Sequence, residues 1–129
     1  MKQCLVVDDS QVVRTVACRI FEELGYETIE AADAETALEL CTENVPEVVF
    51  VDCDIPEGGG VEFTRALHRI RGGMRAAVIV VLTENNVATI TDSLDAGACS
   101  FVMKPFDREM IEEKLSELVL NETPDAASA

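Results

Sequence analysis

The chain has 129 residues, with 25 acidic side chains against 10 basic ones and a formal net charge of −15 at pH 7. This length fits one domain with a sufficient core, and the charge argues against binding to nucleic acid or an anionic membrane, because Lys and Arg bind phosphate groups. No apolar stretch approaches a membrane span and the five cysteines lack disulfide or zinc spacing, so we expect a cytoplasmic protein with protein partners.

Five short apolar runs predict five β-strands. The first, third and fourth runs are continuously apolar and rich in Val, as strands buried on both faces of a parallel sheet are. The second run alternates polar with apolar residues, which indicates a half-exposed strand at an edge. In chain order the predicted strands span residues 4–7, 27–31, 48–52, 78–82 and 101–103.

Between the strands, apolar residues recur at helical spacing and predict five helices. Gly25 is a stop signal for the first helix, and Asp33 is placed to cap the second. In chain order the predicted helices span residues 12–24, 34–41, 63–70 and about 86–96, and the fifth begins at Asp107.

The alternation of strands and helices predicts an α/β fold. It is a doubly wound, five-stranded parallel sheet with five helices, and the edge position of the second strand fits the order 2-1-3-4-5. In that order the ligand crevice lies between the first and third strands. We expect the domain at residues 1–120 and a short disordered tail at residues 121–129.

Polar residues follow the predicted strands where four of them end. Asp8 and Asp9 follow the first strand, Asp52 the third, Thr83 the fourth and Lys104 the fifth. Because ligands of parallel sheets bind outside these ends, we expect the five side chains at one site. Crowded carboxylates usually hold a hard cation such as Mg²⁺, and a carboxylate beside it can attack phosphorus. The pattern therefore predicts a phosphoryl-accepting aspartate, with Thr83 as a hydrogen-bond donor and Lys104 as a pairing charge.

These residues resemble the CheY-like receiver domain of two-component response regulators, here as a single domain with no output domain. The resemblance covers about residues 3–119, and its combined motifs are specific. They are VDDS at 7–10, VDCDIP at 51–56 with Gly60 beyond, LT at 82–83 and KPF at 104–106.

The resemblance implies a flavodoxin-like, CheY-like fold and a role for each matching residue. Asp52 would be phosphorylated by a histidine kinase or a histidine phosphotransfer protein. Mg²⁺ would be bound by Asp8, Asp9, Asp52 and the backbone carbonyl of Asp54. Thr83 and Phe101 would form a switch pair that reshapes the face built by the fourth helix, the fifth strand and the fifth helix, and this face would bind a downstream protein.

Three positions are expected to tune the reaction. Glu84 stands where the family usually has a small residue, so an anion would sit at the mouth through which the phosphodonor and water enter. Asp54 and Asn85 occupy positions that, in the family, tune loss of the phosphoryl group. We expect no enzyme activity beyond gain and loss of the chain's own phosphoryl group.

Two other functions stay open. A receiver-like binding module that is never phosphorylated is favoured by Glu84. An aspartyl-phosphate hydrolase of the haloacid dehalogenase type is suggested by the Asp52-Cys53-Asp54 motif, but here the acidic pair precedes that motif and Pro56 occupies a slot where Thr or Val is expected.

Other features have a structural interpretation beside a functional one. His68 is expected on a solvated helix surface, and Cys53 on the strand face opposite Asp52, in the packing. A basic cluster could dock an acidic partner, but a solvated face partly paired with Glu62 is the interpretation that we favour. The cluster consists of Arg65, Arg69, Arg71 and Arg75.

Overall fold

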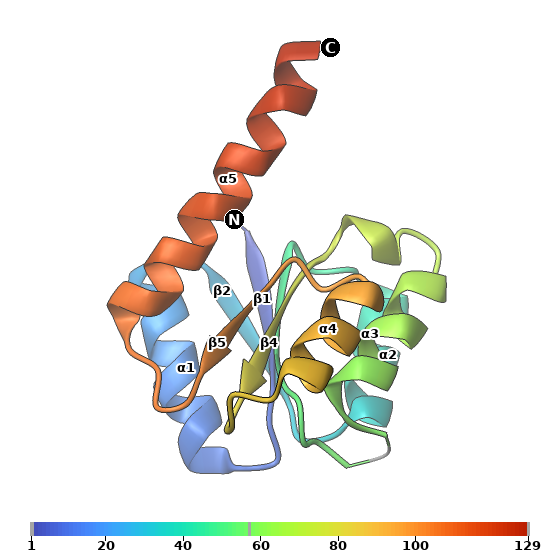
Figure 1. Cartoon of the computed structure of the whole chain (residues 1–129), viewed down its shortest axis with the longest axis vertical. Coiled ribbons are helices and arrows are strands. Elements are labelled where there is room, and N and C mark those ends of the chain that lie inside the picture. Colours follow the sequence, from blue (N-terminus) through green and yellow to red (C-terminus); the bar gives the residue numbers. More distant parts are fainter. Residues whose placement is uncertain (1, 57, 129) are drawn as a thin grey trace.

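The computed structural model describes residues 2–56 and 58–128, with side chains as far as Leu118. Five parallel strands form one sheet, and helices cover both of its faces (Figure 1). In chain order the elements are β1 (Gln3–Val7), α1 (Gln11–Glu23), β2 (Glu27–Ala31), α2 (Ala34–Glu43), β3 (Val48–Asp52), α3 (Gly59–Arg69), the 3₁₀ turn η1 (Gly73–Arg75), β4 (Ala77–Leu82), α4 (Val87–Asp95), β5 (Ser100–Met103) and α5 (Arg108–Ser128).

The strand order is β2-β1-β3-β4-β5, which confirms the predicted topology. Val7, the last residue of β1, is paired with Val51, so Asp8 comes directly after β1 beside Asp52, the last residue of β3. The ends of β4 and β5 are paired in the same way, which brings the other predicted site residues to the same edge of the sheet. The site is therefore a direct consequence of the register.

The two faces of the sheet carry separate hydrophobic cores because successive strand residues point to opposite sides. On one face, strand residues pack with α2 and α3 around Phe63 and Leu67, both almost completely buried. On the other face they pack with α1 and α5, where the ring of Phe21 meets Phe50 edge to face at a centroid distance of 5.3 Å. Burial of these side chains fixes the frame on which the site is built.

The helix starts are defined by side-chain caps. Asp33 accepts a hydrogen bond from the amide of Thr36, as predicted, and Asn86 accepts one from the amide of Thr89 at the start of α4. The Asp107 side chain accepts from the amide of Met110. Such caps satisfy amide groups that have no partner inside the helix.

The prediction that His68 lies on a solvated helix surface is wrong. The ring is half-buried, and its Nδ1 lies 3.2 Å from the carbonyl oxygen of Ala96 at the end of α4. The ring packs over Gly97, where a Cβ would collide with it. The sequence pattern of α3 placed His68 away from the sheet, but a neighbouring helix covers that side.

The cysteines are all free, as expected from their spacing, but their burial differs. Cys4, Cys18 and Cys41 are buried, whereas Cys53 is half-buried and Cys99 is exposed. Burial raises the pKa of the Cys41 thiol to about 11, which keeps it protonated at neutral pH.

The last helix, α5, continues through residues 121–128, where the sequence analysis expected a disordered tail. The division of the chain at residue 120 stays a prediction. Within the part of the chain that the structure describes, no helix combines the length and the apolar character that a membrane span requires.

Candidate functional site

Three carboxylates and one ammonium meet at the carboxyl ends of β1, β3 and β5. Carboxylate oxygens of Asp8, Asp9 and Asp52 lie within 4.8 Å of one another. The Nζ atom of Lys104 lies 3.0 Å from Oδ2 of Asp8 and 3.1 Å from Oδ1 of Asp52. Asp8 and Asp52 are only 3% and 4% exposed, so these ion pairs are shielded from water. The structure therefore brings the predicted carboxylates and the lysine together.

Backbone groups hold the two buried carboxylates in place. The amide of Ser10 donates to Oδ1 of Asp8 over 2.9 Å, and the amide of Asp54 donates to Oδ2 of Asp52 over 3.2 Å. The amide of Lys104 donates to the carbonyl of Leu82 over 2.7 Å, so the peptide that carries the lysine is tied to the end of β4. These bonds fix the carboxylates without using the Lys104 side chain.

Arg14 is a further residue of this region that the sequence analysis did not include. Its Nη1 donates to the backbone carbonyl of Asp8 over 2.7 Å, and its Nε pairs with Glu30 over 3.0 Å. A cation in the first turn of a helix opposes the helix dipole, so it usually needs a compensating contact. That unfavourable position was the signal available in the sequence.

The charges around Asp52 do not balance. Burial raises the pKa of the Asp52 carboxyl above its ordinary value of 3.8; the neighbouring Lys104 lowers it, and Asp8 raises it further. Burial lowers the pKa of the Lys104 ammonium, but its contacts with Asp8 and Asp52 outweigh this and the pKa is raised. At neutral pH one ammonium faces three carboxylates, so the cluster carries an excess of negative charge.

This donor set fits Mg²⁺. Carboxylate oxygens are ligands that Mg²⁺ takes, usually one or two together with water, and the three carboxylates are close enough for a shared ion. Oδ1 of Asp52 is buried and forms no hydrogen bond with any described residue; its contact with Lys104 is an ion pair without hydrogen-bond geometry. Coordination of a cation would satisfy this oxygen. Binding by the carbonyl of Asp54 stays a prediction.

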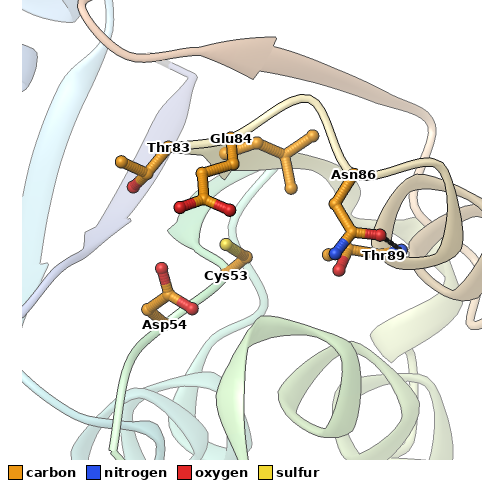
Figure 2. Close-up of a pocket in the computed structure, with 7 residues that line it drawn as sticks. Cys53, Asp54, Thr83, Glu84, Asn86 and Thr89 are labelled. Atoms are coloured by element: carbon orange, nitrogen blue, oxygen red, sulfur yellow. Dashed lines mark hydrogen bonds between the residues drawn. The ribbon is translucent and has the colours of Figure 1, made fainter.

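A polar cavity of about 270 Å³ lies next to the turn that follows β3, and Asp52 is not among the described residues that line it. Figure 2 shows the Glu84 carboxylate pointing into it, on the side of Asp54, with Thr83 at the rim. Asn85 is exposed but is not among the described residues that line the cavity. The lining residues are Cys53, Asp54, Leu82, Thr83, Glu84, Asn86 and Thr89.

The prediction for Cys53 is only partly right. Its side chain packs against the core, but it also lines this cavity. Strand alternation does not extend to it, because β3 ends at Asp52 and Cys53 lies in the following turn. Burial, with the charges of Asp54 and Asp52, raises the pKa of its thiol to about 11. The thiol that lines the cavity is therefore uncharged at neutral pH.

Phe101 lies on β5 with its ring half-buried against the core. The ammonium of Lys114, on α5, lies 5.7 Å from the ring centroid, within the range of a cation–π contact. Its pairing with Thr83 as a switch stays a prediction.

Comparison with known proteins points to one family. The family model described as "Response regulator receiver domain" matches residues 4–116. The chain is 29% identical to Sporulation initiation phosphotransferase F of Bacillus subtilis, a match that covers 90% of this chain and 92% of that protein. It is 30% identical to a Chemotaxis protein CheY homolog of Campylobacter jejuni, with 89% and 90% covered. Other curated relatives are longer, and the chain spans between 17% and 55% of them.

Solved structures agree with this likeness. A CheY-like response regulator receiver domain protein from Methanospirillum hungatei superposes with a TM-score of 0.86 at 27% identity, covering 97% of this chain and 98% of that one. The receiver domain of a sensor histidine kinase from Pseudomonas aeruginosa, solved with a magnesium ion in its active site cleft, gives a TM-score of 0.81 at 25% identity. That match covers 90% of this chain and 95% of the other.

The raised pKa of Asp52 predicts a stability effect that depends on pH. Below pH 3.8 the Asp52 carboxyl is protonated in both the folded and the unfolded chain, so its ionisation does not affect stability there. As the pH rises through the folded-state pKa, the folded chain loses stability, because ionising the carboxyl costs more in the folded chain than in the unfolded one. We expect Asp52→Asn, which cannot ionise, to be more stable than the parent by about 1–3 kcal/mol at pH 7 without divalent cations. Urea unfolding at a series of pH values would measure this difference.

The matched control is Asp95→Asn, because Asp95 is exposed at the end of α4. The gain of Asp52→Asn should shrink toward acid pH. Equal stability of Asp52→Asn and the parent at pH 7 would mean that Lys104 compensates the buried carboxylate fully, contrary to this account.

Proposed function

Because the chain belongs to the response regulator receiver domain family, we propose that Asp52 accepts a phosphoryl group from a phosphohistidine and that the phosphorylated chain binds a protein target. The observation that carries this proposal is the buried Asp52 carboxylate, which contacts a single ammonium within a cluster of three carboxylates. A nucleophile needs an accessible face, and the groove lined by Thr83 and Lys104, the lysine that contacts Asp52, offers an approach.

Each residue has a part in the proposed transfer. An oxygen of Asp52 attacks phosphorus, the bond from phosphorus to the imidazole nitrogen breaks, and the histidine takes up a proton. Mg²⁺, held by Asp8, Asp9 and Asp52, would neutralise the phosphoryl oxygens in flight. Lys104 already lies against Asp52 and can pair with a phosphoryl oxygen, and the Thr83 hydroxyl can donate a hydrogen bond to another.

The surface beside the site supports a protein as the donor. An apolar groove of about 450 Å³ runs between α1 and the loop after β5, and Thr83 and Lys104 line it on the site's side. Val12 and Val16, one helical turn apart, are 74% and 47% exposed on its wall. An amphipathic helix that carries the phosphohistidine would cover these apolar side chains. Histidine kinases and histidine phosphotransfer proteins are therefore the proposed donors, and the cytoplasm is the proposed location.

The proposed output surface is the face formed by α4, β5 and α5. It presents apolar side chains that nothing in the domain covers completely: Val87 is 74% exposed and Leu94 46% exposed on α4. Phe101 and Met103 on β5 are half-buried and line a pocket with Met110 and Lys114 of α5. Movement of Thr83 toward a phosphoryl group would shift the loop that leads into α4, and this shift would change the shape of the face. The chain itself would turn over only its own phosphoryl group.

Beryllofluoride, a mimic of the aspartyl phosphate, tests the proposal directly. With Mg²⁺ and beryllofluoride, the amide NMR signals near Asp52, Thr83, Lys104 and Phe101 should shift in the parent chain. Asp52→Asn is the control, and its signals should stay in place. A parent chain whose signals do not move would favour the binding module that is never phosphorylated.

Glu84 should slow phosphorylation by small anionic donors, because its carboxylate points into the cavity lined by Cys53 and Asp54, the two residues that follow Asp52 (Figure 2). Removing one charge close to a doubly charged donor relieves roughly 1 kcal/mol of repulsion, so Glu84→Gln should react with acetyl phosphate about fivefold faster. Glu39→Gln, at an exposed position of α2, is the matched control. Equal rates of phosphorylation for both variants and the parent would show that Glu84 does not hinder the donor.

A further inference from the structure

A basic surface stands out on a molecule with a net charge of −15. Four of its 10 basic side chains lie between residues 65 and 75. Arg65 is paired with Glu62, whereas Arg69 and Arg71 form no ion pair or hydrogen bond with the residues that the structure describes. Arg75 donates only a long hydrogen bond of 3.4 Å to the carbonyl of Gly72. Three exposed guanidinium groups therefore keep most of their hydrogen-bonding capacity.

Arg71 and Arg75 lie on a turn that is closed by backbone hydrogen bonds. The amide of Gly73 donates to the carbonyl of Ile70 over 2.8 Å, and the amides of Arg75 and Ala76 close two further bonds of 3.1 and 3.2 Å within the turn. Gly72 has a φ of +80°, and a Cβ on Gly73 would collide with the carbonyl of Leu67. Only glycine fits both constraints well, so the backbone is pre-organised and little conformational entropy is lost on binding.

An apolar side chain lies among the charges. Met74, in η1 between Arg71 and Arg75, is 71% exposed, one of the most exposed large apolar side chains among the described residues. Met and Arg are enriched where proteins bind one another, and Arg binds carboxylates through two parallel hydrogen bonds. The combination fits a partner that offers both carboxylates and an apolar side chain.

This surface lies far from the phosphorylation site. The turn precedes β4, so it stands at the amino ends of the strands, whereas the site follows their carboxyl ends. In Figure 1 the yellow-green turn lies at the top of the domain, and the strand ends that carry the site lie at the bottom. A partner bound there would leave Asp52 and the groove beside α1 free.

We propose that Arg69, Arg71, Met74 and Arg75, the Arg–Met turn, bind an acidic segment of a partner protein in both phosphorylation states of Asp52. Carboxylates of the segment pair with the guanidinium groups, and an apolar side chain covers Met74. Nucleic acid fits less well, because a long polyanion would extend beyond the turn onto a surface with a large excess of carboxylates. At physiological salt, charges more than about 8 Å away are largely screened. The acidic segment would therefore interact mainly with the nearby arginines and only weakly with the negative charge of the rest of the molecule.

Fluorescence anisotropy with a labelled synthetic peptide that repeats Glu-Glu-Leu tests this proposal at physiological salt. The parent chain should bind the peptide equally with and without Mg²⁺ and beryllofluoride, and Asp52→Asn should bind it as the parent does, so this test does not depend on the outcome at Asp52. The triple variant Arg69→Ser, Arg71→Ser, Arg75→Ser should lose at least about tenfold in affinity. Met74→Ser should lose affinity for this peptide but not for one that repeats Glu-Glu-Ser.

Arg19→Ser is the matched control, because Arg19 is exposed on α1 and far along the chain from the turn. Circular dichroism of each variant shows that it is folded. The proposal is overturned if the parent does not bind the peptide, or if Arg19→Ser weakens binding as much as Arg71→Ser does. Tighter binding of an oligothymidylate of equal charge would overturn it in favour of nucleic acid.

Discussion

The contact of one ammonium with two buried carboxylates is the interaction on which the candidate site depends. Lys104 lies 3.0 and 3.1 Å from Asp8 and Asp52, and all three follow strand ends that the sheet register brings together. A third carboxylate, from Asp9, leaves the cluster with more negative charge than Lys104 can neutralise. This imbalance costs stability in the folded chain, and it is the reason why we propose that the cluster binds a cation and stabilises phosphoryl oxygens.

The sequence predicted this arrangement because it depends on strand ends. Continuous apolar runs define buried parallel strands, and the residue after each run must lie at the same edge of the sheet, whatever the details of packing. The amphipathic second strand was enough to choose the order 2-1-3-4-5, which the structure confirms. Asp8, Asp52 and Lys104 could therefore be assigned to one site before any contact between them was known.

Periodicity in the sequence did not predict the contacts that one helix or strand makes with another. Periodicity tells which side of a helix faces the sheet, but not whether a neighbouring helix covers another side, so His68 was taken for a solvated residue although it packs over Gly97. Cys53 lies just past the end of β3, where alternation no longer applies. The contact of Arg14 with the backbone of Asp8 joins a helix to a strand end, and no spacing rule encodes it.

The central claim is that Asp52 is the phosphoryl acceptor, and mass spectrometry tests it most directly. The chain would be incubated with Mg²⁺ and phosphoramidate, a small donor with the same phosphorus–nitrogen bond as phosphohistidine, and the modified peptide would be sequenced. The account predicts one phosphoryl group, located on Asp52 and absent from Asp52→Asn. A phosphoryl group on another residue, or none on the parent chain under these conditions, would contradict it.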